Sequence, residues 1–200
     1  AASGITATGA TVSWDSIAAG PYKLRYRVYD GSSTPWINPW QYVDSIYAAS
    51  QAISGLSPET EYQWSVAYLC GSSETYSWNK LFTTTADTTP PTAPANLSVS
   101  NVSGSSLTLS WSASTDDVGV TGYDVLLDGV VVGTASGLSY NYTGLSWGTA
   151  YSLGVRARDA AGNQSALAAI AASTDCQRPN GHAAASGITA TGATVSWDSI

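Results

Sequence analysis

Two pairs of similar segments recur along this chain and define the size of its folding unit. TVSWDS at 11–16 parallels TLSWSA at 108–113, and GLSPETEYQWSV at 55–66 parallels GLSWGTAYSLGV at 144–155. Self-similarity at a regular spacing indicates repeated structural units. Each unit has about 90 residues, which is enough for one small domain with its own core. The chain of 200 residues therefore predicts two related domains in tandem.

A second repeat is exact in every residue. Residues 184–200 are identical to residues 1–17, so the offset between the two copies is 183 residues. We interpret residues 175–200 as the start of a further copy of the first domain, within a tandem array of near-identical units. A duplicated tag is one alternative, and a terminal strand donated to a neighbouring subunit is another.

Apolar and aromatic side chains alternate with polar ones in short runs, which predicts strands with one buried face. Lys23, Arg25 and Arg27 occupy the polar side of one such run. Asp128-Gly129 separates two apolar runs and predicts a two-residue hairpin turn. We interpret the Ala-rich tract 166–172 as a last strand because of its place in the repeat. The predicted inward rows are Ala10, Val12 and Trp14; Leu24, Tyr26 and Val28; Tyr62, Trp64, Val66 and Tyr68; Leu107, Leu109 and Trp111; Tyr123, Val125 and Leu127; and Tyr151, Leu153 and Val155.

The composition supports strands and argues against several classes of function. Ser and Thr together number 52, beside 8 Trp and 12 Tyr, and such residues suit half-buried strands better than helices. A net charge of -7 with only 7 Lys and Arg argues against nucleic-acid binding. No apolar run approaches the ~20 residues that a membrane-spanning helix needs. One His and two Cys leave little material for a metal site or a nucleophilic triad.

Three features of the sequence are shared with one known family of domains. Trp14 and Trp111 lie on the second expected strand of each domain. The L-x-P-x-T-x-Y pattern is complete over 56–62, and it recurs over 145–151 with Trp147 in place of Pro. The third feature is the pair of phrases STDDVGVTGYDVLLDG and VRARDAAGNQSA in the second domain. In these features the chain resembles fibronectin type III domains of secreted or cell-surface bacterial proteins.

This resemblance implies an all-β fold, with two tandem fibronectin type III, immunoglobulin-like β-sandwiches and the first strands of a following repeat. Tyr62 and Tyr151 would be tyrosine corners, whose hydroxyl bonds back to an upstream backbone group. We assign residues 1–85 to the first domain, 86–94 to a Thr/Pro linker and 95–174 to the second domain. The first domain departs from the family pattern, because we expect its first strand to be absent at the N-terminus.

The resemblance also implies a disulfide bond. In similar domains an early Cys pairs with one near the end of the strand that holds the tyrosine corner, here Cys70. Cys70 would then bond to the Cys176 of a preceding unit and close a loop of about 77 residues, worth roughly 4 kcal/mol in the chain-entropy model. The alternative is a direct bond between Cys70 and Cys176 of one chain. Either bond implies an oxidising, extracellular setting.

Candidate residues for chemistry are few, and we expect no catalytic residue, no metal site and no cofactor. His182 stands alone in a boundary loop, and the scattered carboxylates suggest no pair at the separation that glycosidase chemistry requires. Asp116, Asp117, Asp159 and Asn163 belong to loops at one end of this fold, where their oxygens could converge on calcium. Their spacing matches no known calcium loop, and Asp and Asn are also ordinary turn residues.

An aromatic segment over 34–47 is the main candidate for a contact surface. It holds Trp36, Trp40, Tyr42 and Tyr47, and the two Trp face the same way on an extended chain because they are four residues apart. The segment could fold over its own sheet edge, contact another protein, or stack on sugar rings.

Two further surface features could carry a function. Ser16, Ser45 and Thr88 stand in contexts that resemble the Asp-Ser/Thr-apolar acceptor of some bacterial O-glycosylation systems. The basic row at 23–27 could set the register between neighbouring domains or subunits, or it could be a solvated face. The acidic residues on the equivalent strand of the second domain are Asp124 and Asp128.

We expect the chain to be a non-catalytic structural repeat unit of an extracellular bacterial surface fibre, filament or adhesin shaft. Small sandwiches joined by a short linker extend reach without adding chemistry, and identical patches at a fixed pitch favour self-association. Glycans are a further candidate partner. The alternative is a polysaccharide-binding or spacer module of a secreted carbohydrate-active enzyme, with Trp36 and Trp40 touching the polymer.

Overall fold

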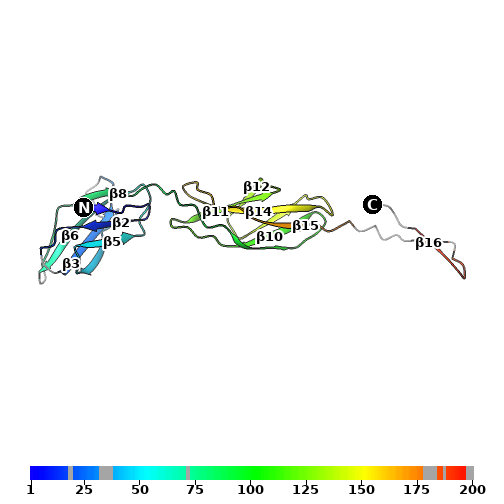
Figure 1. Ribbon diagram of the computed structural model, residues 1–200, viewed down its shortest axis with the longest axis horizontal. Helices are drawn as coiled ribbons and strands as arrows, with labels where there is room; N and C mark the ends of the chain where they lie inside the picture. The colour runs from blue at the N-terminus through cyan, green and yellow to red at the C-terminus, as the bar shows by residue number, and fades with distance from the viewer. Residues whose placement is uncertain (18–19, 32–37, 71–72, 178–183, 187, 197–200) are drawn as a thin grey trace. The chain divides into compact units, whose positions relative to one another are not determined.

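The computed structural model describes residues 1–17, 20–31, 38–70, 73–177, 184–186 and 188–196. Every regular element in these ranges is a β-strand, so the expected all-β class is confirmed (Figure 1). The described part of the chain holds no helix long and apolar enough to cross a membrane. The chain divides into two compact units: residues 1–89 with 117–119, and residues 90–116 with 120–200.

The first unit is a sandwich of two antiparallel sheets. One sheet has the order β1 (Ala2–Ser3), β2 (Gly9–Ser13) and β5 (Ser50–Ser54). The other has the order β4 (Gln41–Ile46), β3 (Tyr22–Val28), β6 (Glu61–Cys70) and β7 (Ser73–Tyr76), and β8 (Lys80–Thr83) pairs with the first half of β6. Both sheets contribute to one core, in which Val12, Leu24 and Trp64 are almost completely buried.

The N-terminus holds part of the strand that we expected to be absent. Ala2 and Ser3 form β1 and lie opposite Val12 and Thr11 of β2. The backbone continues this pairing, because the amino group of Ala1 donates to the carbonyl of Ser13 at 2.6 Å. The expectation was wrong here because a two-residue strand is too short to show an alternating pattern.

The exact repeat forms the same strand pair at its second position. β16 (Ala184–Ser186) pairs with β17 (Thr194–Ser196) in the register that β1 has with β2. Val195 of β17 is 56% exposed, whereas its counterpart Val12 is fully buried. The second copy therefore has the local pairing of the first without the core that stabilises it.

The second unit has the same plan of two antiparallel sheets. One sheet has the order β13 (Ser139–Thr143), β10 (Ser106–Ser112) and β9 (Ala95–Ser100). The other has the order β12 (Val130–Ala135), β11 (Val120–Leu127), β14 (Ala150–Asp159) and β15 (Ala168–Ser173), so the Ala-rich tract is a strand. Its fully buried core residues are Leu107, Leu109, Val125, Leu153, Val155 and Ala157.

Matching ring pairs show which strands of the two units are equivalent. Trp14 and Tyr22 lie edge to face with 5.5 Å between ring centroids, and Trp111 and Tyr123 do so at 5.3 Å. In both pairs the Tyr hydroxyl accepts a backbone N–H from the loop after the Trp. β3 is therefore the counterpart of β11, with Tyr22 at the position of Tyr123.

The connections that follow these equivalent strands differ in length. β11 and β12 are joined by Asp128 and Gly129, whose φ angles of 50° and 83° fit the two-residue type I′ turn of a tight hairpin. In the first unit, residues 29–40 separate β3 from β4. The aromatic segment over 34–47 thus begins in an enlarged loop and continues into β4.

Candidate functional site

Three cations of β3 lie on the outer face of their sheet, and an aromatic ring lies against each of them. The guanidinium carbon of Arg25 lies 4.4 Å from the ring centre of Trp40 and 3.8 Å from that of Tyr76. The guanidinium of Arg27 contacts the same Trp40 ring at 4.6 Å. Side chains of a strand alternate between faces, so these cations share the side opposite the core. We call this surface the cation–aromatic face: Lys23, Arg25, Arg27, Trp40, Tyr42 and Tyr76.

Cross-strand partners hold the two arginines in place. Arg25 lies opposite Ser65 of β6, and its Nε donates to the Ser65 hydroxyl at 2.8 Å. Arg27 lies opposite Gln63, and its Nε donates to Gln63 Oε1 at 3.0 Å. Arg25 makes no ion pair with any residue that the structure describes. Among the described residues, its charge is therefore held by two aromatic rings and one hydroxyl.

Lys23 completes the basic row but is neutralised locally. Its ammonium lies 3.0 Å from Glu74 and 3.4 Å from Asp44, and it sits 5.1 Å from the ring centre of Tyr42. The hydrogen bond between Lys23 and Glu74 raises the pKa of Lys23 and lowers the pKa of Glu74. The available positive charge of the face thus lies nearer Trp40 than Glu74.

The structure separates the residues of the predicted aromatic patch. Trp40 and Tyr42, two residues apart, both lie on the cation–aromatic face; Trp40 is half-buried and Tyr42 is 51% exposed. Tyr47 is 71% exposed but lies against Gly20, beyond the end of β4. Trp36 lies outside the described residues. Sequence reasoning missed Tyr76, because only the pairing of β7 with β6 brings it to this face.

The equivalent position in the second unit carries the opposite charge. Asp124 follows Tyr123 as Lys23 follows Tyr22, and its carboxylate lies 3.3 Å from Arg156 and 3.2 Å from Arg158. At the position of Arg25, the second unit has Leu126, which is buried. The second unit therefore has an ion-paired face without the stacked arginine of the first. Asp128 lies in the β11–β12 turn, where its carboxylate accepts the N–H of Ser152 at 2.8 Å.

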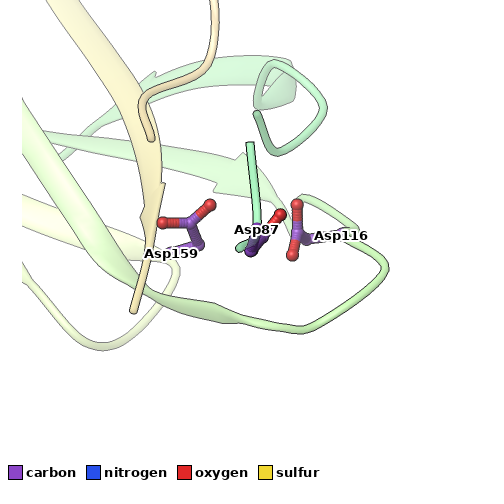
Figure 2. A group of neighbouring side chains, drawn as sticks. All are labelled: Asp87, Asp116 and Asp159. Carbon is purple, nitrogen blue, oxygen red and sulfur yellow. The ribbon is translucent and has the colours of Figure 1, made fainter. Parts of the chain in front are cut away.

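Figure 2 labels three carboxylates, of which Asp116 and Asp159 belong to the second unit. Asp116 follows β10 and Asp159 ends β14, and one carboxylate oxygen of each lies within 4.8 Å of the other. Asp159 is buried and accepts hydrogen bonds from the backbone N–H and Nδ2 of Asn163 at 2.9 and 2.8 Å. Carboxylate oxygens are the ligands that calcium takes, so this pair could contribute ligands to a cation.

Sequence reasoning placed Asp116 and Asp159 at one end of the fold, and the structure brings their carboxylates together. Asp117, which we considered with them, is not a member of this pair. Asp87, the third residue of Figure 2, falls in the segment that we assign to the linker. A turn is the role that this segment suggests, since Asp87 Oδ1 accepts the N–H of Thr89 at 3.0 Å.

The remaining predicted residues occupy the following places. The hydroxyls of Tyr62 and Tyr151 accept the backbone N–H of the residue five positions upstream, each at 2.9 Å. Cys70 and Cys176 are both free and exposed thiols, so the direct bond within one chain is not formed in this structure. The candidate O-glycosylation residues Ser16, Ser45 and Thr88 are all exposed, and Ser16 shares a hydrogen bond of 3.2 Å with the Tyr22 hydroxyl.

Each unit has two stacked sheets, a Trp–Tyr pair on equivalent strands, and a Tyr whose hydroxyl accepts an upstream backbone N–H. These features define each unit as an immunoglobulin-like β-sandwich. Residues 91–172 match the family model of the fibronectin type III domain. The second unit is therefore a fibronectin type III domain, and the first unit has the same plan of two antiparallel sheets.

Three curated relatives of the chain are named as enzymes. Chitinase A1 of Niallia circulans is 35% identical over 184 residues, which are 88% of this chain but 25% of the relative. Exoglucanase B of Cellulomonas fimi is 36% identical over 202 residues, covering 95% of this chain and 18% of the relative. Alpha-amylase of Niallia circulans is 47% identical over 88 residues, covering 44% of this chain and 7% of the relative. The chain thus spans a quarter or less of the length of each.

These relatives overturn the expectation of a surface fibre. We expected a structural repeat unit because one stretch of the chain recurs exactly, but these relatives are named as a chitinase, an exoglucanase and an alpha-amylase rather than as fibre or adhesin proteins. The expectation gave the 17-residue repeat too much weight, because a short exact repeat carries no information about what a module does.

Proposed function

We propose that this chain is a non-catalytic part of a secreted carbohydrate-active enzyme, where it spaces other domains and contacts polysaccharide through its first unit. One observation carries the proposal. Stretches similar to this chain or to part of it occur in a chitinase, an exoglucanase and an alpha-amylase, and they make up 25%, 18% and 7% of these proteins. A small part shared by enzymes of different named activity cannot supply the chemistry of each, so its role is common to all of them.

The cation–aromatic face supports polysaccharide contact. Trp40 lies over two guanidinium groups, and Tyr42 lies over the Lys23 ammonium. Ring stacking on sugars uses the flat face of an aromatic side chain, and rings held by neighbours lose little conformational entropy on binding. The arginine and lysine donors beside these rings match sugar hydroxyls, which accept hydrogen bonds.

The extracellular setting follows from the same proposal. Chitin, cellulose and starch are polymers that an organism degrades outside its cells when it feeds on them, so a module that accompanies such enzymes is exported with them. The low share of charged residues, 10%, and the abundance of Ser and Thr fit a surface in contact with hydroxyl-rich polymers. The O-glycosylation of Ser16, Ser45 and Thr88 and a disulfide between Cys70 and Cys176 of adjacent units belong to this setting as proposals.

Co-sedimentation tests the proposal. The full chain is mixed with insoluble chitin, crystalline cellulose and granular starch, and the protein left in solution is measured, together with the release of soluble sugar. We expect depletion by at least one polymer and no sugar release. Trp40→Ala and Tyr42→Ala should weaken binding at least about fivefold, the loss expected of a residue that carries contact energy.

Tyr47→Ala is the matched control, because Tyr47 is an exposed aromatic residue away from the cation–aromatic face. Circular dichroism spectra establish that each variant keeps the fold. Equal depletion by wild type and by the Trp40 and Tyr42 variants would remove the face from the proposal. Absence of depletion by all three polymers would leave a spacer role alone.

A further inference from the structure

A cavity of the first unit lies beside the cation–aromatic face. Residues 29–40 stand where the second unit has the two-residue turn at Asp128 and Gly129. A cavity of about 320 Å³ lies between the end of this connection and the sandwich edge. Long loops on a rigid sandwich are where binding residues concentrate. The residues that line the cavity and enter the argument are Tyr26, Arg27, Asn38, Gln41, Leu56 and Tyr62.

The apolar walls of this cavity are rigid. Tyr62 is 5% exposed, stacks on Phe82 with 5.6 Å between ring centroids, and accepts the N–H of Ser57 at 2.9 Å. Tyr26 packs against the core cluster of the unit. Their positions are set by the sandwich rather than by the loop, so the ring surfaces exist before any ligand arrives. Preformed walls of this kind are typical of small-molecule sites.

The polar side of the cavity presents three planar groups. Arg27 is 8% exposed and is fixed by its bond to Gln63 and by the Trp40 ring. Asn38 donates through Nδ2 to Asp30 at 3.0 Å, which orients its amide. Gln41 is exposed, and its side-chain amide forms no hydrogen bond with the residues that the structure describes. Arg27 borders the cavity and also touches Trp40, so the cavity and the cation–aromatic face adjoin.

We propose that this cavity is a subsite for one neutral sugar ring of a polysaccharide chain that lies on the cation–aromatic face. A sugar hydroxyl both donates and accepts hydrogen bonds, and an Asn or Gln amide presents a donor and an acceptor side by side. The Arg27 fork adds donors, and the tyrosine rings suit the C–H face of a sugar. Asp30 behind Asn38 disfavours an acidic sugar. The inference rests on the proposed polysaccharide contact and gives it a location.

The volume is consistent with one ring. About 320 Å³ equals roughly ten water molecules at ~30 Å³ each, which is close to the heavy-atom count of a hexose. It also lies at the lower end of the ~300–1,000 Å³ range of small-molecule sites. A single ring fills such a space, and the rest of the polymer continues over Trp40 and Tyr42.

Titration of the full chain with soluble oligosaccharides tests the subsite. Hexamers of the chitin, cellulose and amylose series are added, and heat and Trp fluorescence are recorded. Gln41→Ala and Asn38→Ala each remove hydrogen bonds to the ligand, and we expect each to weaken binding about fivefold. Gln51→Ala removes an amide from β5 of the opposite sheet. Among the described residues this amide donates to the Ala52 carbonyl alone, so the variant should bind as wild type does.

The outcomes separate the subsite from the proposed function. If the wild type binds a hexamer and only the Trp40 and Tyr42 variants lose affinity, the cavity is not a subsite, while polysaccharide contact stands. If the wild type binds no hexamer and no insoluble polymer, both the subsite and the contact role are wrong. Loss of affinity in the Gln41 and Asn38 variants, with Gln51→Ala unchanged and all spectra native, is the result that supports the subsite.

Discussion

The guanidinium of Arg25 lies 3.8 Å from the ring centre of Tyr76, although 51 residues separate them in the chain. The same guanidinium also meets Trp40, the residue before β4, at 4.4 Å. One cation therefore joins β3 and β7 to the residue that precedes β4, and it holds Trp40 on the surface. The function that we propose for Trp40 depends on this packing, because a ring that is free to rotate offers no fixed platform.

Replacing Arg25 tests whether planar stacking or charge alone holds the rings. Arg25→Ala removes two ring contacts and the bond to Ser65, and we expect the first unit to lose about 1–2 kcal/mol of stability. Arg25→Lys keeps the charge but not the planar fork, so it should recover less than half of that loss. Urea denaturation followed by Trp fluorescence measures both. A Lys variant as stable as wild type would show that charge is sufficient.

The ion pair of Lys23 with Glu74 gives a pH-dependent contribution. The pKa of Glu74 is lowered in the folded protein, so its contribution is present above about pH 4.5 and is lost as the pH falls through the lowered value. The pKa of Lys23 is raised, so its contribution is present below about pH 10.5 and is lost as the pH rises through the raised value. Both groups are on the surface, which keeps the effect small and sensitive to salt.

NMR titration of the Glu74 side chain checks this prediction. We expect its pKa below that of an unperturbed Glu, and we expect Lys23→Met to return it toward the ordinary value because the hydrogen bond is its main cause. A salt concentration near 1 M should reduce the difference between wild type and variant. A Glu74 pKa unchanged by Lys23→Met would mean that the pair does not persist in solution.

Much of the fold could be predicted from alternation, because each inward row is a local pattern. Val12, Leu24 and Trp64 are buried as their positions in the alternating rows predict. The candidate site was less predictable, since it depends on which strands pair. Nothing in the sequence near Trp40 shows that Arg25 and Arg27 will lie against its ring.

A tryptophan packed on a glycine gives a sharp prediction in the second unit. A Cβ added to Gly104 would meet ring atoms of Trp147 at 1.9–2.2 Å, far inside van der Waals contact. Gly104→Ala must therefore displace the indole, and we expect a loss of about 1–3 kcal/mol. Gly137→Ala is the control, because nothing lies within 4 Å of its added Cβ. Thermal unfolding compares the two. Equal melting temperatures would show that Trp147 moves aside without cost.

Residues added ahead of Ala1 should complete the edge of the first unit. Trp14 and Asp15 line a cavity of about 380 Å³, and the pairing of Ala1 with Ser13 directs any preceding residue along them. In the second unit the segment before β9 covers the corresponding place: Pro91 and Pro94 are buried, and Thr92 and Thr115 exchange backbone and side-chain hydrogen bonds. Trp111 is accordingly buried, whereas Trp14 is half-buried.

The segment to add is 175–183, because it stands ahead of the second copy of residues 1–17. Fused before Ala1, with Ser in place of the added Cys so that no disulfide contributes, it should raise the melting temperature of the first unit by several degrees. We expect the buried apolar contacts to contribute ~1–2 kcal/mol of stability. In a domain of this size each kcal/mol raises the melting temperature by about 4–8 °C. Trp emission should move to shorter wavelength as Trp14 leaves water. A Gly/Ser extension of the same length is the control, and equal melting of the two fusions would show that the cavity does not receive this segment.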